Sequence, residues 1–168
     1  MKILVCTASK HGATAQIGEA IATRLSSVGH DVITRDPAAV RDLDGVDAVV
    51  LGSAVYAGHW LKPARELIER MGTQLAERPV WLFSSGPVGN PPKPEENAVD
   101  VAGVVATTGA VEHRVFAGLV DTAQLSLAER AMVRAFRAAV GDFRDWDQIT
   151  AWAGKIDTQL RAARSSGQ

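Results

Sequence analysis

Small and hydroxyl-bearing residues fill the segment between the first apolar run of the sequence and its first amphipathic stretch. Ser9-Lys10-His11-Gly12-Ala13-Thr14 follows the run Lys2–Thr7 and precedes apolar residues at helical spacing. Backbone N–H groups at a strand-to-helix turn, together with the helix N-terminus, form a cradle for an anion. The segment therefore predicts a phosphate-binding loop. An ordinary turn without a ligand is the alternative, because Ser, Gly and Thr are common turn residues.

The residues of this segment exclude several kinds of phosphate chemistry. Neither G-x-G-x-x-G nor G-x-x-x-x-G-K-S/T is present, which removes the usual dinucleotide and Walker-type sites. A thiol phosphatase needs an arginine six positions after its cysteine, but Gly12 follows Cys6 at that distance. A phospho-receiver domain needs acidic residues after its first and third strands, where this chain has Thr7 and Ser53. The loop is expected to bind phosphate without attacking it, and Cys6 to be a buried core residue.

Two further segments that follow apolar runs carry residues suited to a flat ring. Gly52–Trp60 contains the rings of Tyr56, His59 and Trp60, and stacked rings contribute about 0.5–1.5 kcal/mol beyond their burial. The alternative is that Trp60 packs on the following helix and Tyr56 lies at a rim. In Ser84–Asn90, glycines allow backbone amides to approach a ring edge. A plain surface loop is the alternative there.

The first segment resembles the phosphate loop of the flavodoxin-like family, which reads S/T-x-S/T-G-x-T. Ser9, Gly12 and Thr14 match this pattern, whereas His11 places an imidazole where the family has a hydroxyl. The resemblance implies FMN as the cofactor and no metal site. The residues assigned to FMN are Ser9, Lys10, His11, Gly12, Ala13, Thr14, Ala54, Val55, Tyr56, Gly58, Trp60, Ser85, Gly86, Pro87 and Gly89.

Over nearly the whole chain the sequence is similar to the flavodoxin-like, quinone-dependent protoporphyrinogen IX dehydrogenases. One departure is that Ala57 separates Tyr56 from Gly58, where the family is expected to have its tyrosine adjacent to the glycine. The matching features are Gly58-His59 before an aromatic residue, Lys93-Pro94-Glu95, Phe116-Ala117-Gly118, an arginine-bearing helical insertion, and Asp145-Trp146.

This resemblance implies an oxidoreductase of heme biosynthesis that uses FMN. Its small-molecule substrate would be a reduced tetrapyrrole, and a quinone would accept the electrons. The alternative is a flavodoxin-type electron-transfer protein that serves a redox partner protein and has no substrate of its own. An NAD(P)H:quinone reductase is a weaker third interpretation, because no second nucleotide motif is evident.

Four basic side chains are candidates for roles beyond cofactor binding. His59 is the candidate catalytic residue, because an imidazole with a pKa near ~6.5 can relay a proton to a reduced flavin. A loop residue with a backbone partner is the alternative. Arg130, Arg134 and Arg137 share one face of a predicted helix and could pair with tetrapyrrole propionates or lipid phosphates. The alternative for them is a solvated helix face.

Apolar runs of strand length alternate with helical stripes along the chain, which is typical of a parallel sheet covered on both faces. The sequence therefore predicts an α/β fold with a doubly wound five-stranded parallel sheet. One domain spans residues 1–164, and residues 165–168 form a frayed tail. The expected strands are 2–7, 31–35, 47–53, 79–84 and 113–120. The expected helices follow residue 12, cover 63–75, resume near Glu95, cover 125–140 and begin at Asp145, which caps the last one.

The composition limits the partners and the location that we expect. The 168 residues carry a net charge of -1, so no overall field attracts nucleic acid. No apolar stretch approaches the ~20 residues that span a bilayer, and the N-terminus has no signal-peptide pattern. We expect a cytoplasmic protein. Peripheral contact with the inner face of the membrane and a homodimer remain open.

Overall fold

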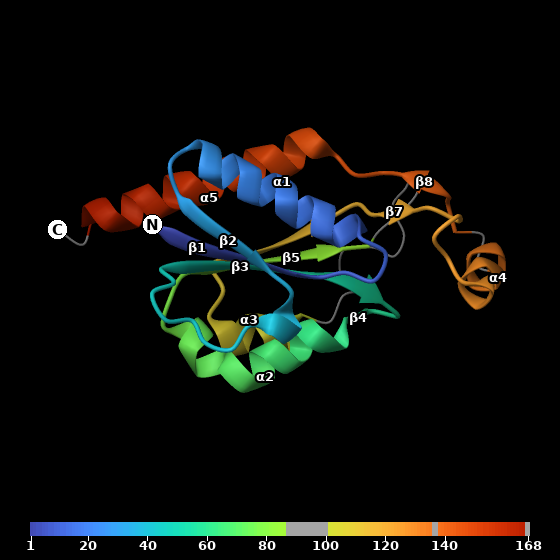
Figure 1. Cartoon of the computed structure of the whole chain (residues 1–168), viewed down its shortest axis with the longest axis horizontal. Coiled ribbons are helices and arrows are strands. Elements are labelled where there is room, and N and C mark those ends of the chain that lie inside the picture. The colour runs from blue at the N-terminus through green and yellow to red at the C-terminus, as the bar shows by residue number, and fades with distance from the viewer. Residues whose placement is uncertain (87–100, 136–137, 167–168) are drawn as a thin grey trace.

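The structure is a computed structural model of the chain and describes residues 1–86, 101–135 and 138–166. A central sheet lies between two layers of helices, and a small unit sits beyond one end of the sheet (Figure 1). The predicted positions Pro87, Gly89 and Arg137 lie outside the described residues, as does the helix expected near Glu95.

Five parallel strands form the body of the sheet. They are β1 (Lys2–Ala8), β2 (Asp31–Arg35), β3 (Ala48–Tyr56), β5 (Val80–Ser85) and β6 (Glu112–Phe116), in the spatial order β2-β1-β3-β5-β6. The predicted fold class is confirmed. The connections leave β1 toward one edge and β3 toward the other, so the crevice between these two strands is a topological switch point, where open α/β sheets bind ligands.

Helices cover both faces of the sheet. On one face lie α1 (Ala13–Ser27) and α5 (Trp146–Ser166), and on the other lie α2 (Lys62–Ala76) and α3 (Ala102–Thr108), as Figure 1 shows. A short 3-10 helix, η1 (Pro37–Ala39), follows β2. The last helix continues to Ser166, past the domain boundary predicted at residue 164. Within the described stretches, none of the helices combines the length and the apolar composition needed to cross a bilayer.

Alternation along β1 explains the two halves of the core. Ile3 and Val5 pack in the cluster beneath α1 and α5, whereas Leu4 and Cys6 pack in the cluster beneath α2. Successive side chains of a strand point to opposite faces, so a fully apolar strand serves both layers. Burial raises the pKa of the Cys6 thiol to about 12, with Asp36 adding to the shift. Cys6 is therefore a core residue, as predicted.

An aromatic cluster under α5 requires a glycine in the neighbouring strand. Phe83 contacts Phe116 and Trp152, with ring centroids 5.8 and 6.1 Å away. Gly52 lies opposite Phe83 in the register of β3 and β5. A Cβ atom at residue 52 would lie 2.1 Å from the Phe83 ring, so only glycine leaves room for this packing.

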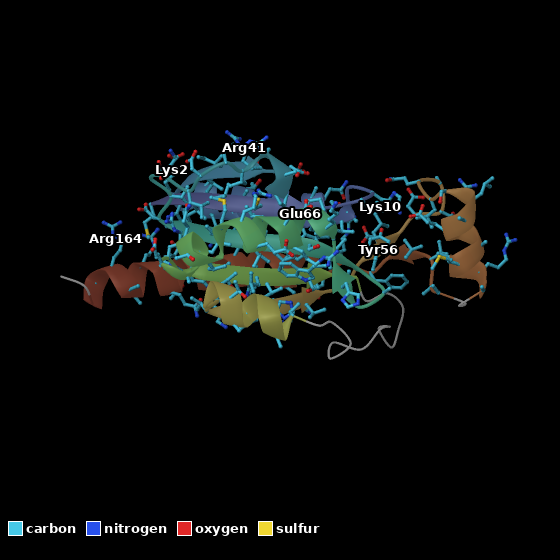
Figure 2. The ribbon with its side chains drawn as sticks, turned by 90° about the horizontal axis from the view of Figure 1, so that it is seen from below. Lys2, Lys10, Arg41, Tyr56, Glu66 and Arg164 are labelled. Atoms are coloured by element: carbon cyan, nitrogen blue, oxygen red, sulfur yellow. The ribbon has the colours of Figure 1, made fainter. Side chains whose placement is uncertain are left out.

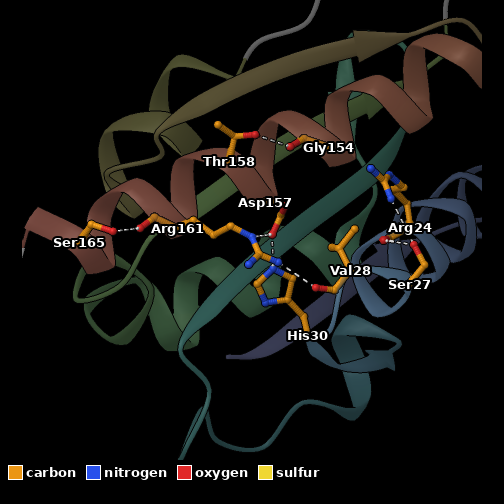
Figure 3. A network of polar contacts seen from close by, with 9 residues as sticks. All are labelled: Arg24, Ser27, Val28, His30, Gly154, Asp157, Thr158, Arg161 and Ser165. Carbon is orange, nitrogen blue, oxygen red and sulfur yellow. Dashed lines mark hydrogen bonds and ion pairs between the residues drawn. The ribbon is translucent and has the colours of Figure 1, made fainter.

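A polar network joins the C-terminal end of α1 to α5 (Figure 3). The ring of His30 lies 2.8 Å from Asp157 through Nε2 and Oδ1, and both side chains are largely buried. Arg161 donates to the same carboxylate oxygen at 2.7 Å and to the Val28 carbonyl at 2.8 Å. Burial opposes ionisation of Asp157, but these hydrogen bonds outweigh it and lower its pKa.

Gly52–Trp60, most of which we expected to lie beyond the strand 47–53, is largely a β-hairpin. β3 continues to Tyr56, and β4 (His59–Trp60) returns antiparallel to it, pairing Val55 with Trp60. The two turn residues, Ala57 and Gly58, both have positive φ angles, 50° and 79°. Such φ values are those of a type I′ turn, whose twist matches that of paired strands. The strand that we expected to end at residue 53 therefore continues to Tyr56, because this turn allows β3 to pair with β4.

The described residues between Ala117 and Asp145, which we call the insertion, form the unit beyond the sheet. It contains β7 (Leu119–Val120), α4 (Leu127–Ala135) and β8 (Gly141–Asp142). The strand predicted at 113–120 is thus wrong in length, since β6 ends at Phe116 and β7 pairs with β8 instead. The helix predicted at 125–140 is also shorter, and none of the described residues of α4 is buried.

Arg144 fastens the insertion to the start of α1. Its guanidinium donates to the Gln16 side chain at 2.6 Å and to the Ala13 carbonyl at 3.3 Å. It also pairs with Asp142 at 2.7 Å and lies over the ring of Trp146, 4.6 Å from its centroid. The insertion is therefore held against the first turn of α1, next to the predicted phosphate loop.

Candidate functional site

The carboxyl ends of the parallel strands surround a cavity of about 150 Å³, which we call the edge chamber. Most of the residues assigned to a cofactor from the sequence line it, so the structure brings the three predicted segments together. Gly118, Leu119 and Val120 of the insertion complete the wall and were not predicted. The predicted residues that line it are Ser9, Lys10, His11, Ala13, Thr14, Ala54, Val55, Tyr56, Ser85 and Gly86.

The loop between β1 and α1 has the backbone of an anion cradle. Gly12 is the N-cap of α1, with a φ of +82° that favours glycine. The first helical hydrogen bond runs from the Gln16 amide to the Gly12 carbonyl at 3.0 Å. The amides of residues 13–15 precede this bond, so they have no acceptor within the helix. These donors are available to an anion.

Two hydroxyl side chains of the loop also fit an anion-binding site. The Ser9 hydroxyl oxygen is buried and has no hydrogen-bond partner within the described parts of the chain. Thr14 lies in the first turn of α1 and lines the edge chamber, although its side chain is only 2% exposed. Buried polar atoms are normally paired, so an unpaired hydroxyl beside a chamber fits a ligand that supplies acceptor oxygens.

Close backbone contacts form the far wall of the chamber. A Cβ atom added at Gly86 would lie 3.3 Å from the Cβ of Val55, and one added at Gly118 would lie 3.3 Å from the Cα of Gly86. The Gly86 amide donates to the Phe116 carbonyl at 3.3 Å. Glycine at these positions lets the segments after β5 and β6 approach the end of β3 without side chains between them.

A carboxylate from α4 pairs with the side chains of the loop. Glu129 accepts from Lys10 at 2.7 Å, and its same oxygen lies 3.0 Å from Nε2 of His11. These contacts link residues that are more than 100 positions apart in the sequence. The Lys10 hydrogen bond contributes most to lowering the pKa of Glu129 far below its ordinary range. The carboxylate is therefore ionised at neutral pH.

Glu129 also caps its own helix. Its other carboxylate oxygen accepts from the Ser126 amide at 2.9 Å, and the Glu129 amide lies 3.3 Å from the Ser126 hydroxyl. This reciprocal pair is a capping box, which satisfies two amides at a helix start. One side chain thus defines the beginning of α4 and attaches that helix to the loop.

Tyr56 lies between the edge chamber and the insertion. Figure 2 shows Lys10 and Tyr56 between the sheet and α4, and the Lys10 ammonium lies 5.4 Å from the centroid of the tyrosine ring. The side chain is 42% exposed. Burial raises the pKa of Tyr56, and Lys10 only partly opposes this shift, so the phenol is protonated at neutral pH. Tyr56 therefore offers a ring face and a hydrogen-bond donor.

Trp60 does not line the chamber, so its assignment to FMN stays a prediction. It is 3% exposed and packs in the core beneath α2. Its indole Nε1 donates to the Ser84 hydroxyl at 2.7 Å, and that hydroxyl lies 2.8 Å from Nε2 of His113. The hairpin points Val55 and Trp60 to the same side, so Trp60 is buried while Tyr56 faces outward. The packing of Trp60 in the core with α2 matches the alternative given for it.

Other predicted residues lie away from the chamber. His59 is exposed on β4 opposite Tyr56. It lines neither the edge chamber nor a second cavity that lies between the loop and α4, so its catalytic role stays a prediction. Gly58 belongs to the hairpin turn. The Arg130 guanidinium donates to the Leu125 carbonyl at 3.0 Å, and Arg134 is exposed on α4. Neither arginine lines the two cavities.

Sequence reasoning missed the contribution of the insertion to this site. Leu119 and Val120, expected in a strand, line the chamber, and Glu129, from the helix that we expected to present arginines, pairs with Lys10 and His11 of the loop. The S-x-x-E spacing of Ser126 and Glu129 is a readable signal for the start of a helix. No local pattern indicates that Glu129 would pair with a loop so distant in the sequence.

Comparisons with known proteins agree with this geometry. A family model described as a flavodoxin domain matches residues 4–147. None of the curated protein sequences compared with the chain matches it. The chain belongs to the flavodoxin domain family, since the match covers most of its length.

Solved structures show the same fold at low sequence identity. Oxidised Flavodoxin 1 from Bacillus cereus is 15% identical with a TM-score of 0.65, over 94% of this chain and 98% of that one. The flavodoxin of Streptococcus pneumonia TIGR4 is 17% identical with a TM-score of 0.61, over 95% and 99%. Rubredoxin oxygen:oxidoreductase from Desulfovibrio gigas is 13% identical with a TM-score of 0.62, over 96% of this chain and 36% of that one.

Proposed function

We propose that this protein binds FMN in the edge chamber and acts as a flavin-dependent redox protein. The observation that carries the proposal is the turn from Ser9 to Thr14, whose free amides and unpaired Ser9 hydroxyl lie at the switch point of the sheet. Membership of the flavodoxin domain family supports the same cofactor. A phosphate at the start of α1 is favoured by the helix dipole as well as by hydrogen bonds.

The residues of the chamber divide the work of holding FMN. The amides after Gly12, with the hydroxyls of Ser9 and Thr14, would hold the phosphate. Backbone groups near Ala54 and Gly86 would face the ring, and Tyr56 would offer it an aromatic surface. When bound, FMN supplies electron transfer, and the protein sets position, solvent access and electrostatics.

The described residues around the chamber supply little acid or base chemistry. Cys6 is buried and its pKa is raised to about 12, so its thiol is not a nucleophile. The Tyr56 phenol is protonated and can donate a hydrogen bond. Glu129 is ionised and engaged by Lys10 and His11. These side chains suit a protein that orients a redox cofactor and excludes water from it.

As a finer proposal, the redox reaction is the dehydrogenation of protoporphyrinogen IX with a quinone as electron acceptor. The sequence resemblance supports this substrate and this acceptor. The predicted pairing of Arg130, Arg134 and Arg137 with propionates or lipid phosphates has no support from the two described arginines, which line neither cavity.

An electron carrier without a substrate is the second candidate function. The observation in its favour is that the compared flavodoxins cover nearly all of this chain and are themselves covered almost fully. The net charge of -1 counts against it, because carriers that dock on several partners commonly use a strong field of one sign.

An anaerobic assay separates these functions. The protein is first loaded with FMN, and protoporphyrinogen IX is then added while the visible absorbance of the flavin is followed. The enzyme predicts direct bleaching of the flavin and recovery of its colour on addition of a soluble quinone. Bleaching only when a flavoprotein reductase and its nucleotide are present would assign the protein to the carriers. A protein that never retains FMN would overturn both functions.

A further inference from the structure

A second cavity of about 300 Å³ lies between the edge chamber and α4, and we call it the insertion chamber. It shares Lys10, His11, Ala13 and Tyr56 with the edge chamber, along with Leu119 and Val120 of β7. The two chambers are therefore neighbours on one wall. The volume is at the lower end of the roughly 300–1,000 Å³ of small-molecule sites.

The far wall of the insertion chamber is one face of α4 and of the turn before it. Leu125, Glu129, Met132 and Val133 line the cavity at the spacing of a single helical face. Leu127 does not line it and is 84% exposed. Met132 and Val133 of α4 thus line the cavity, whereas Leu127 of the same helix does not. A substitution at Leu127 can serve as a matched control for substitutions in the cavity wall.

The charges in this chamber are already compensated. The Lys10 ammonium pairs with Glu129 at 2.7 Å, and His11 faces the same carboxylate at 3.0 Å. Asp121 adds a second carboxylate, which accepts from the Ala123 amide at 2.9 Å and from the Gln124 side chain at 3.2 Å. An anionic ligand would find no unpaired cation among the lining residues, and desolvating its charge would be unfavourable.

We propose that the insertion chamber binds an uncharged, largely apolar compound of one or two fused rings. Leu119, Val120, Leu125, Met132 and Val133 supply apolar contact, and the Tyr56 phenol and Gln124 amide supply groups for one polar substituent. The existence of the insertion chamber does not depend on the proposed function. The use of this chamber as a reactant site beside FMN does rest on the proposed function. The chamber is therefore expected to bind uncharged molecules more tightly than acidic ones. A site lined by arginines would show the reverse preference.

Calorimetric titration with two matched probes tests this specificity. Naphthol and naphthalenesulfonate share two fused rings but differ in charge. The FMN-loaded protein is expected to bind one naphthol per chain at least about tenfold more tightly than the sulfonate, because the anion must be buried beside Glu129 and Asp121. Equal binding, or preference for the sulfonate, would overturn the proposal, as would an absence of naphthol binding.

Variants of α4 locate the binding site. Val133→Trp fills the chamber and Val133→Asp places a carboxylate in its apolar wall, so both should weaken naphthol binding by about tenfold or more. Leu127→Trp, on the outward face, should leave it unchanged. Because none of the described residues of α4 is buried, these changes should leave the melting temperature of the sheet domain in place. Unaltered naphthol binding in both Val133 variants would place the ligand elsewhere and overturn the proposal.

FMN retention, measured separately for every variant, distinguishes this inference from the proposed function. Naphthol binding to a protein that rejects FMN would leave the chamber assigned and the redox function lost. FMN binding without naphthol selectivity would keep the redox function and overturn the assignment of the insertion chamber.

Discussion

At the scale of single residues, the site depends on a few side chains near the first turn of α1. Thr14 offers a hydroxyl in that turn, and Glu129 brings a carboxylate to the loop from α4. The two have opposite consequences for a bound phosphate. A hydroxyl can donate to it, whereas a nearby carboxylate repels it and competes for the same donors.

Thr14→Val removes the hydroxyl while keeping the branched shape of the side chain. Loss of one hydrogen bond to a charged group is expected to weaken FMN binding by about tenfold or more. Riboflavin, which lacks the phosphate, should bind the variant as it binds the original protein. Fluorescence titration measures both affinities.

The matched control for this variant is Thr23→Val, at an exposed position of the same helix. It should leave both affinities unchanged. An FMN affinity that survives Thr14→Val would count against the assignment of the loop to phosphate.

Glu129→Gln should strengthen FMN binding and leave riboflavin binding nearly unchanged. The carboxylate engages Lys10 and His11, so neutralising it frees these donors and removes a repulsive charge. For a partly solvated site we expect roughly a threefold gain at low ionic strength, which should shrink as salt is added. Titrations at two salt concentrations measure the effect.

Glu69→Gln serves as the control, because Glu69 is an exposed acid on α2. If Glu129→Gln instead weakens FMN and riboflavin equally, Glu129 acts only by holding α4 in place.

At the scale of elements, the hairpin of β3 and β4 decides which aromatic side chain reaches the chamber. Its turn places Ala57 at a φ of 50°, in the left-handed region that a residue with a Cβ rarely adopts. Register then places Tyr56 opposite His59 and Val55 opposite Trp60. The strained turn therefore controls a contact of the candidate site.

Ala57→Asn should stabilise the protein, because Asn-Gly is a preferred pair for a type I′ turn. Relief of left-handed strain at Ala57 is expected to raise the free energy of unfolding by about 0.5–1 kcal/mol. Urea unfolding measures this change, and Ala76→Asn at the exposed end of α2 should not reproduce it. A lower stability for Ala57→Asn would mean that the turn is held by contacts that asparagine disturbs.

The hairpin also shows how far sequence patterns predict this protein. Apolar runs of strand length and long helical stripes predicted the five parallel strands and most helices. A period-two alternation across Val55, Tyr56, His59 and Trp60 would have separated an inward pair from an outward pair, had Ala57-Gly58 been recognised as a turn. The turn is hard to recognise from the sequence, because Ala is an unusual first residue for a type I′ turn.

The partners of Glu129 were beyond prediction for a different reason. A capping box is local and can be recognised in four residues, but the pairing of Glu129 with Lys10 and His11 depends on how the insertion folds back over the sheet. Arg144 and its contact with Gln16 direct that return. Side chains that meet through such long connections leave no periodic signal in the sequence.

At the scale of the whole molecule, stability depends on the two helical layers and on the polar network that joins α1 to α5 (Figure 3). Asp157 accepts from His30 and Arg161 at the largely buried centre of that network. Its pKa is lowered in the folded protein, despite the opposing effect of burial. Its carboxylate therefore stabilises the fold above the unfolded-state pKa, and this contribution is lost as the pH falls through the folded-state pKa.

Asp157→Asn should lower the free energy of unfolding at pH 7 by about 1–2 kcal/mol, because two charge-assisted hydrogen bonds are lost. The difference from the original protein should narrow below about pH 4, where the carboxylate of the original protein becomes protonated. Urea unfolding at several pH values measures it, with Asp44→Asn as an exposed control. A difference that stays constant with pH would show that shape, not charge, matters at this position.

The affinity of the protein for FMN, compared with its affinity for riboflavin, tests the phosphate site at the start of α1. Protein freed of cofactor is titrated with FMN and, separately, with riboflavin, and flavin fluorescence is followed. We expect one FMN per chain and binding at least about tenfold tighter than that of riboflavin, because the phosphate engages the amides at the start of α1. No FMN binding, or equal affinity for the two flavins, would contradict it.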